Sequence, residues 1–134
     1  MAPPQVHPES GAVRAAWDSL TAAFLAGDWA PYREFFVDAP DFRMMHPDGR
    51  EWLAGPAEFA DVYKERIKGT SDWDVATHRF EVSVSPGGSV AWTAAEVYID
   101  AGDWAQTSWQ LAVWQKVEGR WRVASAMAAL VAPE

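Results

Sequence analysis

The amino-acid sequence predicts an α+β domain in which helices lie across one face of a curved, mostly antiparallel sheet. Two observations support this fold class. Residues 73–131 contain four runs rich in Val, Trp, Thr and Phe, separated by three turn signals. Before them, apolar residues recur at the three- and four-residue spacing of amphipathic helices. A chain of 134 residues is long enough to bury the core of one such domain.

Two helices are expected at the start of the folded domain, which we place at residues 10–134. Residues 1–9 contain three prolines and are expected to form a loose arm. Ser10 can cap a helix that ends near Ala26, where Gly27 provides the left-handed residue that commonly follows a helix. A second, shorter helix follows, with a proline in its first turn.

A short hairpin and a third helix complete the first half. Residues 42–46 and 51–53 form the arms of the hairpin, on either side of a turn at residues 47–49. The Gly55–Pro56 pair then opens a helix that stops at Gly69. The order of elements is therefore helix, helix, hairpin, helix and four long strands.

The four long strands are expected at residues 73–84, 90–99 and 104–117 and after Gly119. Because side chains alternate between the two faces of a strand, we expect one face of these strands to border a pocket. Two residues of this pocket-side set are ionisable, which makes them candidates for chemistry. The set contains Ala76, His78, Phe80, Val82, Trp92, Ala94, Glu96, Tyr98, Trp109, Leu111, Val113, Trp121, Val123, Ser125, Met127 and Ala129.

Composition and charge argue against several classes of function. A net charge of −8 disfavours nucleic acids and anionic membranes as partners. The chain has no cysteine for a disulfide or a thiolate site, and no apolar run of membrane length or leader-like start, so we expect a soluble, cytoplasmic protein. Its three histidines lack metal-binding spacing and it has no phosphate-binding loop, so we expect neither a metal nor a cofactor.

Three segments resemble the SnoaL-like branch of the nuclear-transport-factor-2-like superfamily, which includes ketosteroid isomerase, scytalone dehydratase and polyketide cyclases. They are residues 24–29 (FLAGDW), residues 35–55 and residues 117–123 (VEGRWRV). The resemblance covers roughly residues 10–131. It implies a cone-shaped sheet with three N-terminal helices on its concave face, an enclosed pocket and often a dimer through the outer sheet face. It does not specify a reaction, because this fold hosts many functions.

Matching residues to the family gives His46 as the main catalytic candidate. His46 stands where ketosteroid isomerase carries its aspartate base, at the end of a strand and before a proline. The positions of that enzyme's two hydrogen-bond donors, a tyrosine and a protonated aspartate, fall near Leu20 and Leu111, which cannot donate. Residues 127–129 (MAA) replace the His-x-Ser of many relatives and make that wall apolar.

A second candidate is a dyad of His78 and Glu96. If the hairpin pairs Val84 with Val90, these two side chains lie opposite each other on one face, where the carboxylate could orient the imidazole. The prediction depends on the register, because a slip of one residue moves Glu96 to the other face. Alternatively, His78 is a hydrogen-bonded core residue and Glu96 reaches solvent.

The most favoured function is cofactor-free acid–base catalysis on a small, hydrophobic, oxygenated molecule, as in an isomerase, dehydratase or cyclase. The alternatives are a non-catalytic ligand-binding domain and a dimeric accessory domain whose pocket is filled by side chains. A partner surface for a homodimer is expected on the outer face of the second long strand, at Ala91, Thr93, Ala95, Val97 and Ile99. The expected substrate-binding residues are Trp17, Met44, Trp52, Phe59, Tyr63, Trp92, Tyr98, Trp109, Leu111 and Met127.

Overall fold

The computed structural model describes residues 7–46 and 51–131. Its helices are α1 (Ser10–Ala26), α2 (Trp29–Arg33) and α3 (Gly55–Arg66), and a short 3₁₀ turn, Ile67–Gly69, follows α3. Its strands are β1 (Arg43–Met45), β2 (Trp52–Ala54), β3 (Asp74–Val84), β4 (Val90–Asp100), β5 (Ala105–Val117) and β6 (Arg120–Leu130). Most of the predicted N-terminal arm and the predicted turn at 47–49 lie outside the described residues.

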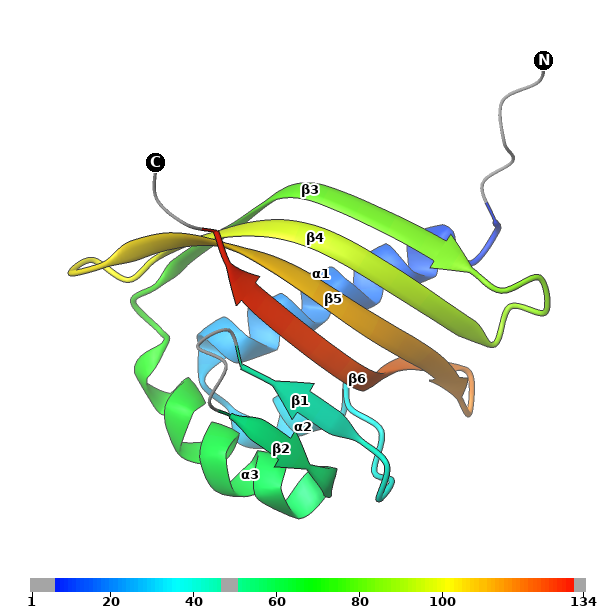
Figure 1. Cartoon of the computed structure of the whole chain (residues 1–134), viewed down its shortest axis with the longest axis horizontal. Coiled ribbons are helices and arrows are strands. Elements are labelled where there is room, and N and C mark those ends of the chain that lie inside the picture. The colour runs from blue at the N-terminus through cyan, green and yellow to red at the C-terminus, as the bar shows by residue number, and fades with distance from the viewer. Residues whose placement is uncertain (1–6, 47–50, 132–134) are drawn as a thin grey trace.

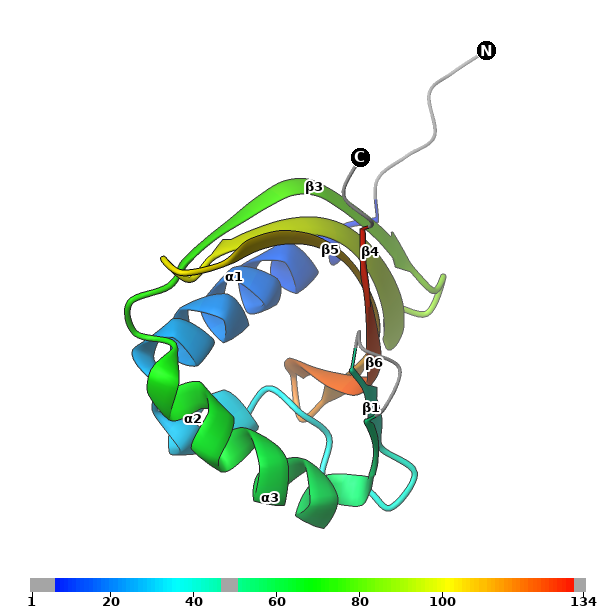
Figure 2. The ribbon, with the colours of Figure 1, turned by 60° about the vertical axis from the view of Figure 1, so that its left-hand side comes forward.

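The six strands form one sheet in the order β2-β1-β6-β5-β4-β3. β1 runs parallel to β6, and the other neighbouring pairs are antiparallel. The long strands are curved, α1 lies across their concave face, and α2 and α3 lie on the same side (Figure 1, Figure 2). The α+β class is therefore confirmed. The order of elements is the predicted one, but only α1 and α2 are N-terminal, because α3 follows the β1–β2 hairpin.

The ends of α1 are fixed by Glu9 and Gly27. The helix begins at Ser10, so the N-cap is Glu9 and not Ser10, contrary to the prediction, and the side chain of Glu9 makes no capping hydrogen bond. Gly27 has a φ of 70°, as predicted for the helix stop, and a Cβ there would meet the carbonyl oxygen of Ile67 at 2.8 Å. The stop therefore requires glycine both for its backbone conformation and for its packing.

The register of the β3–β4 hairpin differs by one residue from the predicted one. Val84 pairs with Ala91, and the backbone N–H of Ser85 donates to the carbonyl of Val90. A bulge at His78 shifts the register again, so that Arg79 pairs with Glu96. The predicted pairing of His78 with Glu96 is wrong for this reason.

The one-residue shift exchanges the two faces of β4 relative to the prediction. The residues of β4 that were expected on the outer face lie on the concave side, which the helices cover. Four of them are buried there: Ala91, Thr93, Ala95 and Val97. Their neighbours therefore lie on the convex face. The same correction applies to β5, whose buried residues are Ser108, Ala112 and Trp114. The residues moved to the convex face are Ala76, His78, Trp92, Ala94, Glu96, Tyr98, Trp109, Leu111, Val113, Ser125, Met127 and Ala129.

The core occupies the space between the concave face and the helices. Trp114 is fully buried, and its indole N–H donates to Thr93 at 3.0 Å. At the other end, α2 and α3 meet through a cluster of aromatic rings, in which Phe36 and Phe59 lie 4.6 Å apart. No helix of the described residues is long and apolar enough to span a membrane.

Candidate functional site

A cavity of about 470 Å³ separates the helices from the concave face of the sheet. Its lining is mainly apolar and aromatic, which is the usual form of a small-molecule site. The helices contribute Trp17, Leu20, Thr21, Phe24, Tyr32, Tyr63 and Arg66, and the segment before β3 contributes Trp73. The sheet side contributes residues that include Met44, His46, Val97, Ile99, Gln106, Ser108, Gln110, Val123, Ala126 and Ala128.

Two ionisable residues of the cavity wall, His46 and Arg66, form a cluster with Glu51. The β1–β2 hairpin brings His46 and Glu51 together, because the backbone N–H of His46 donates to the carbonyl of Glu51. Their side chains are also close, with Nδ1 of His46 3.9 Å from Oε1 of Glu51. Arg66, at the end of α3, donates from Nη2 to both carboxylate oxygens of Glu51 at 2.8 Å. Glu51 is therefore held between a cation and an imidazole.

Arg66 also packs against Tyr63, with its guanidinium carbon 4.7 Å from the ring centre. Burial alone lowers the pKa of a guanidinium, but the hydrogen bond to Glu51 and the neighbouring Tyr63 raise the pKa of Arg66 above its usual value. Arg66 is therefore a permanent cation. Its charge is balanced by Glu51, so the cluster adds little net charge to the cavity.

Two tyrosines, Tyr32 and Tyr63, line the cavity from α2 and α3. Burial raises the pKa of Tyr32 well above its usual value, and Tyr63 adds to this effect. Burial also raises the pKa of Tyr63, although Arg66 opposes it. Both hydroxyls therefore keep their protons at neutral pH and can serve as hydrogen-bond donors.

A comparison with protein-family models matches residues 13–132 to the SnoaL-like domain. The chain belongs to the SnoaL-like domain family. Its match covers most of the folded part, including both cavity walls. A comparison with curated proteins finds no match.

Solved structures with the same fold are distant in sequence from this SnoaL-like chain. A candidate dehydratase of the NTF2-like family from Streptomyces avermitilis is 20% identical, with a TM-score of 0.80, and the match covers 93% of this chain and 97% of that one. A ketosteroid isomerase-like protein from Erwinia carotovora atroseptica is 20% identical, with a TM-score of 0.70 and coverages of 96% and 100%. A candidate calcium/calmodulin-dependent protein kinase II association domain from Xanthomonas campestris is 15% identical, with a TM-score of 0.78 and coverages of 100% and 95%. These likenesses show the fold alone.

Several of the residues expected at the site of this SnoaL-like domain do border the cavity. They include His46, Trp17, Met44 and Tyr63. Trp17 is fixed in place by its indole N–H, which donates to Thr77 of β3 at 3.1 Å.

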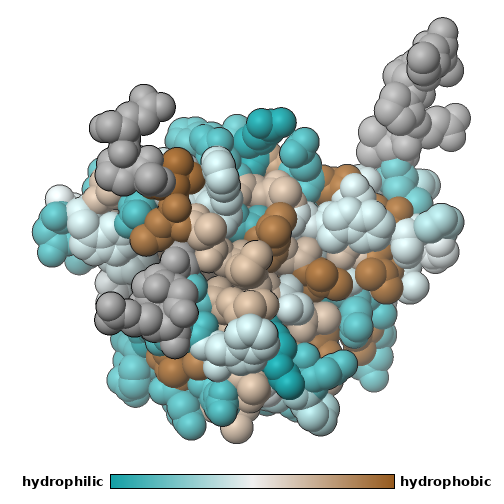
Figure 3. Space-filling model, viewed as in Figure 1, coloured by the Kyte–Doolittle hydropathy of each residue, from teal (hydrophilic) through white to brown (hydrophobic). Residues whose placement is uncertain are grey.

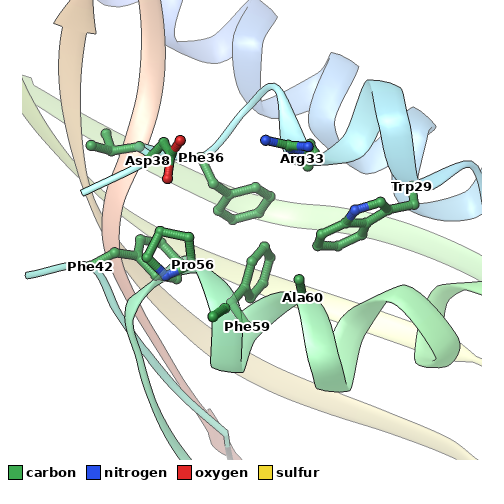
Figure 4. Close-up of a pocket in the computed structure, with 10 residues that line it drawn as sticks. Trp29, Arg33, Phe36, Asp38, Phe42, Pro56, Phe59 and Ala60 are labelled. Carbon is green, nitrogen blue, oxygen red and sulfur yellow. The ribbon is translucent and has the colours of Figure 1, made fainter. Parts of the chain in front are cut away.

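Two expected residues lie elsewhere than in the main cavity. Phe59 lines a smaller cavity of about 230 Å³ between α2 and α3, where it faces Phe36 (Figure 4). Phe36 borders both cavities, so its ring is part of the wall between them. Trp52, on β2, is 64% exposed.

The other expected residues have their side chains on the convex face. Trp92 and Trp109 are 53% and 59% exposed, and His78 lies beside Tyr98 with ring centres 6.1 Å apart. Glu96 is on the same face. Leu111 and Met127 are at the border of the cavity, but they alternate with inward residues, so their side chains are on the convex face. These residues are 51% and 42% exposed. The predicted His78–Glu96 dyad is therefore outside the cavity.

Sequence reasoning missed Glu51, Arg66 and the polar residues of β5. Glu51 could have been found, because the predicted hairpin already placed it opposite His46. Arg66 could not, because its approach depends on how α3 packs against the hairpin. Once the register of β5 is known, the alternation of its side chains places three polar residues on the concave face: Gln106, Ser108 and Gln110. Among the described residues, no group of three His, Cys, Asp or Glu side chains could hold a metal ion.

Proposed function

We propose that this SnoaL-like protein is a cofactor-free enzyme that moves a proton on a small, largely apolar, oxygenated substrate, as an isomerase, dehydratase or cyclase does. One observation carries the proposal: His46, the only histidine among the cavity-lining residues described, is paired with a carboxylate that is itself held by an arginine. A base inside an apolar enclosure is the requirement of this chemistry.

The three ionisable residues of the cluster have different roles in this proposal. His46 takes the proton from the substrate through Nε2, because Nδ1 faces Glu51. The carboxylate of Glu51 stabilises the imidazolium that forms, and Arg66 holds this carboxylate in position. A positioned base of this kind contributes roughly 10²–10⁴-fold to a rate.

The cavity also supplies neutral hydrogen-bond donors for the substrate. Tyr63 lines the wall beside Arg66. Gln110 lines it from the sheet. These groups can bind a carbonyl or hydroxyl oxygen without introducing an opposing charge. Two similar structures carry the names of a candidate dehydratase and a ketosteroid isomerase-like protein, which supports the same class of reaction.

The test is turnover of 5-nitrobenzisoxazole, a neutral probe for a base in an apolar pocket. Removal of its ring C–H proton breaks the N–O bond and releases 2-cyano-4-nitrophenolate, which absorbs visible light. We expect the wild type to catalyse this step and His46→Ala to lose about 10²-fold or more in kcat/KM. His78→Ala, which changes a histidine of the convex face, is the matched control and should retain full activity. Wild-type turnover at the buffer rate, or full activity in His46→Ala, would overturn the proposal.

The alternative is a ligand-binding domain without catalysis. It is favoured by one comparison, since a candidate kinase association domain shares the fold. It predicts that ligands bind the cavity equally well in the wild type and in His46→Ala, and that neither protein turns them over.

We also propose a homodimer through the convex face of the sheet. The dimer surface was expected at alternate residues of β4 from Ala91 to Ile99, but these residues lie on the concave side. The convex face also carries exposed apolar residues. Trp92 pairs with Val113 and Leu111 pairs with Met127 across neighbouring strands, and all four are more than 40% exposed. Figure 3 shows apolar side chains gathered over this face. Exposed apolar surface of this kind is typical of protein interfaces.

A further inference from the structure

We propose that a polar strip on β5, formed by Gln106, Ser108 and Gln110, selects ligands that carry two oxygen atoms along one edge of a neutral ring system. The inference deepens the proposed function and rests on it, because it assigns the substrate contacts of the same cavity. The three residues alternate along the concave face and all line the cavity.

The strip is isolated in apolar surroundings. Gln110 lies between Ala95 of β4 and Ala128 of β6. Ser108 lies between Val97 and Leu130 in the same two strands. Gln106 pairs with Ile99. The neighbouring strands therefore offer the strip no polar side chains, and its polar groups turn to the cavity.

The strip retains most of its hydrogen-bonding capacity. Within the described part of the chain, its side chains make one hydrogen bond, from Nε2 of Gln110 to Oγ of Ser108 at 3.2 Å. The carbonyl oxygen of Gln110, the hydroxyl proton of Ser108 and the whole amide of Gln106 are left for a ligand. Amides and hydroxyls both donate and accept, so either carbonyl or hydroxyl oxygens of a ligand can be bound.

The register places one end of this strip level with His46. β1 and β6 are parallel and pair Met45 with Met127, so the next position brings His46 beside Ala128, which pairs with Gln110. Two strand spacings separate His46 from Gln110, or about 10 Å between their backbones. The small side chain of Ala128 lies between them. A ring system lying over Ala128 can therefore reach His46 with a C–H bond while its oxygens meet the strip.

The charges of the cavity favour a neutral ligand over an anion. Among the described residues that line the cavity, Arg66 is the only Lys or Arg, and Nη2 of its guanidinium already binds both oxygens of Glu51. The strip itself carries no charge. Nε2 of Gln110 and Oγ of Ser108 lie 3.2 Å apart and act as one polar group. Alternate residues of a strand are spaced by about 7 Å, so one ligand oxygen can meet this pair while a second oxygen on the same edge meets Gln106.

The test compares two isomers as probes, 2,7-dihydroxynaphthalene and 1,5-dihydroxynaphthalene. The first carries its hydroxyls on one edge at about the ~7 Å spacing of alternate strand residues, whereas the second carries them on opposite edges. Size and polarity are otherwise matched. Isothermal titration calorimetry should show that the wild type binds the 2,7 isomer about tenfold more tightly, the value of one or two hydrogen bonds.

Variants of the strip test whether its side chains cause the preference for the 2,7 isomer. Gln110→Met keeps the length of the side chain without its amide, and Ser108→Ala removes the hydroxyl; both should reduce the preference to about twofold or less. Gln115→Met, the same substitution at an exposed position of β5 outside the strip, should leave it unchanged. Thermal unfolding of each variant checks that the fold is intact.

Equal binding of the two isomers, no binding of either, or a preference that survives in both strip variants would overturn the inference. The outcome is separable from that of the proposed function. If His46→Ala keeps the preference while the wild type has no turnover, the strip stands and the base assignment fails. If turnover depends on His46 but the isomers bind equally, only the strip fails.

Discussion

At the scale of single residues, the proposed function depends on the two contacts of the Glu51 carboxylate. Its carboxylate is 2.8 Å from Nη2 of Arg66 and 3.9 Å from Nδ1 of His46. The arginine therefore fixes the carboxylate, and the carboxylate acts on the histidine. Removing the carboxylate of Glu51 and removing the guanidinium of Arg66 should therefore have different effects on the reaction.

We expect Glu51→Gln to lower kcat for 5-nitrobenzisoxazole about tenfold or more with little change in KM, because the imidazolium loses its counter-charge in the transition state. Arg66→Met removes the group that positions this carboxylate but leaves the carboxylate on the same hairpin as His46, so its loss in kcat should be smaller. Steady-state kinetics of both variants measure the difference. An unchanged kcat in Glu51→Gln would show that the carboxylate does not assist the base.

The sequence identified His46 through its place in a family pattern, and the structure brings it to the cavity. The other predicted pair failed for a physical reason that can be stated. Both faces of β4 are apolar or small, with Ala95 and Val97 on one side and Trp92 and Ala94 on the other. Alternation therefore could not decide which face is inward, and the bulge at His78 left no local signal in the sequence.

At the scale of elements, the boundaries of the helices and long strands agree closely with the predicted ones, because glycine and turn residues mark them. What the sequence did not show is how distant elements are joined. Glu9, at the start of α1, accepts hydrogen bonds from Nζ of Lys116 at 2.9 Å and from the indole N–H of Trp121 at 2.8 Å. These contacts connect the start of α1 to the β5–β6 hairpin, which lies near the other end of the sequence.

The Glu9 contacts should make stability depend on pH. The hydrogen bond from Lys116, followed by that from Trp121, lowers the pKa of Glu9 below its usual value of 4.5. The folded state therefore holds this carboxylate ionised more strongly than the unfolded state. Its contribution is present above about pH 4.5 and is lost as the pH falls through the lowered value.

We expect Glu9→Gln to lower the urea midpoint at pH 7, and the gap from the wild type to close below pH 4.5 as the wild-type carboxyl is protonated. Urea titrations at several pH values measure both effects. Glu118→Gln, which changes a carboxylate in the β5–β6 turn, serves as the control. A gap that stays constant over the whole pH range would contradict this role of the charge.

Gly11, within α1, and Gly27, directly after it, should respond in opposite directions to substitution by alanine. Gly27→Ala should destabilise the fold by about 1–3 kcal/mol, because alanine is strained at positive φ and its Cβ would meet the Ile67 carbonyl. Gly11→Ala should stabilise it by up to about 1 kcal/mol, because Gly11 is exposed within the helix and a Cβ meets nothing within 4 Å. Thermal and urea unfolding measure both changes. A stable Gly27→Ala variant would show that the turn can rearrange.

At the scale of the whole molecule, the curved sheet presents two apolar faces with different uses. The concave face borders the cavity and the core, and the convex face exposes tryptophans and aliphatic side chains. A solvated sheet normally carries polar residues on its outer face. The exposed apolar residues of the convex face support the homodimer that we propose.

We expect sedimentation to show a dimer at micromolar concentration. Trp109→Glu or Leu111→Glu should shift the protein to a monomer, because each places a charge in the middle of the proposed interface, where charged residues are depleted. Gln115→Glu, at an exposed position near the end of the same strand, is the control. A wild-type monomer at tens of micromolar would remove the proposal of a homodimer.

In the proposed function, His46 moves a proton of a ligand inside the cavity. The most direct measurement is the rate of hydrogen–deuterium exchange at the carbon between the ring and the carbonyl of 2-tetralone, followed by NMR in deuterium oxide. We predict that the wild type and His78→Ala accelerate this exchange equally, and that His46→Ala loses about 10²-fold or more of the acceleration. Equal exchange by the wild type and His46→Ala would contradict the account.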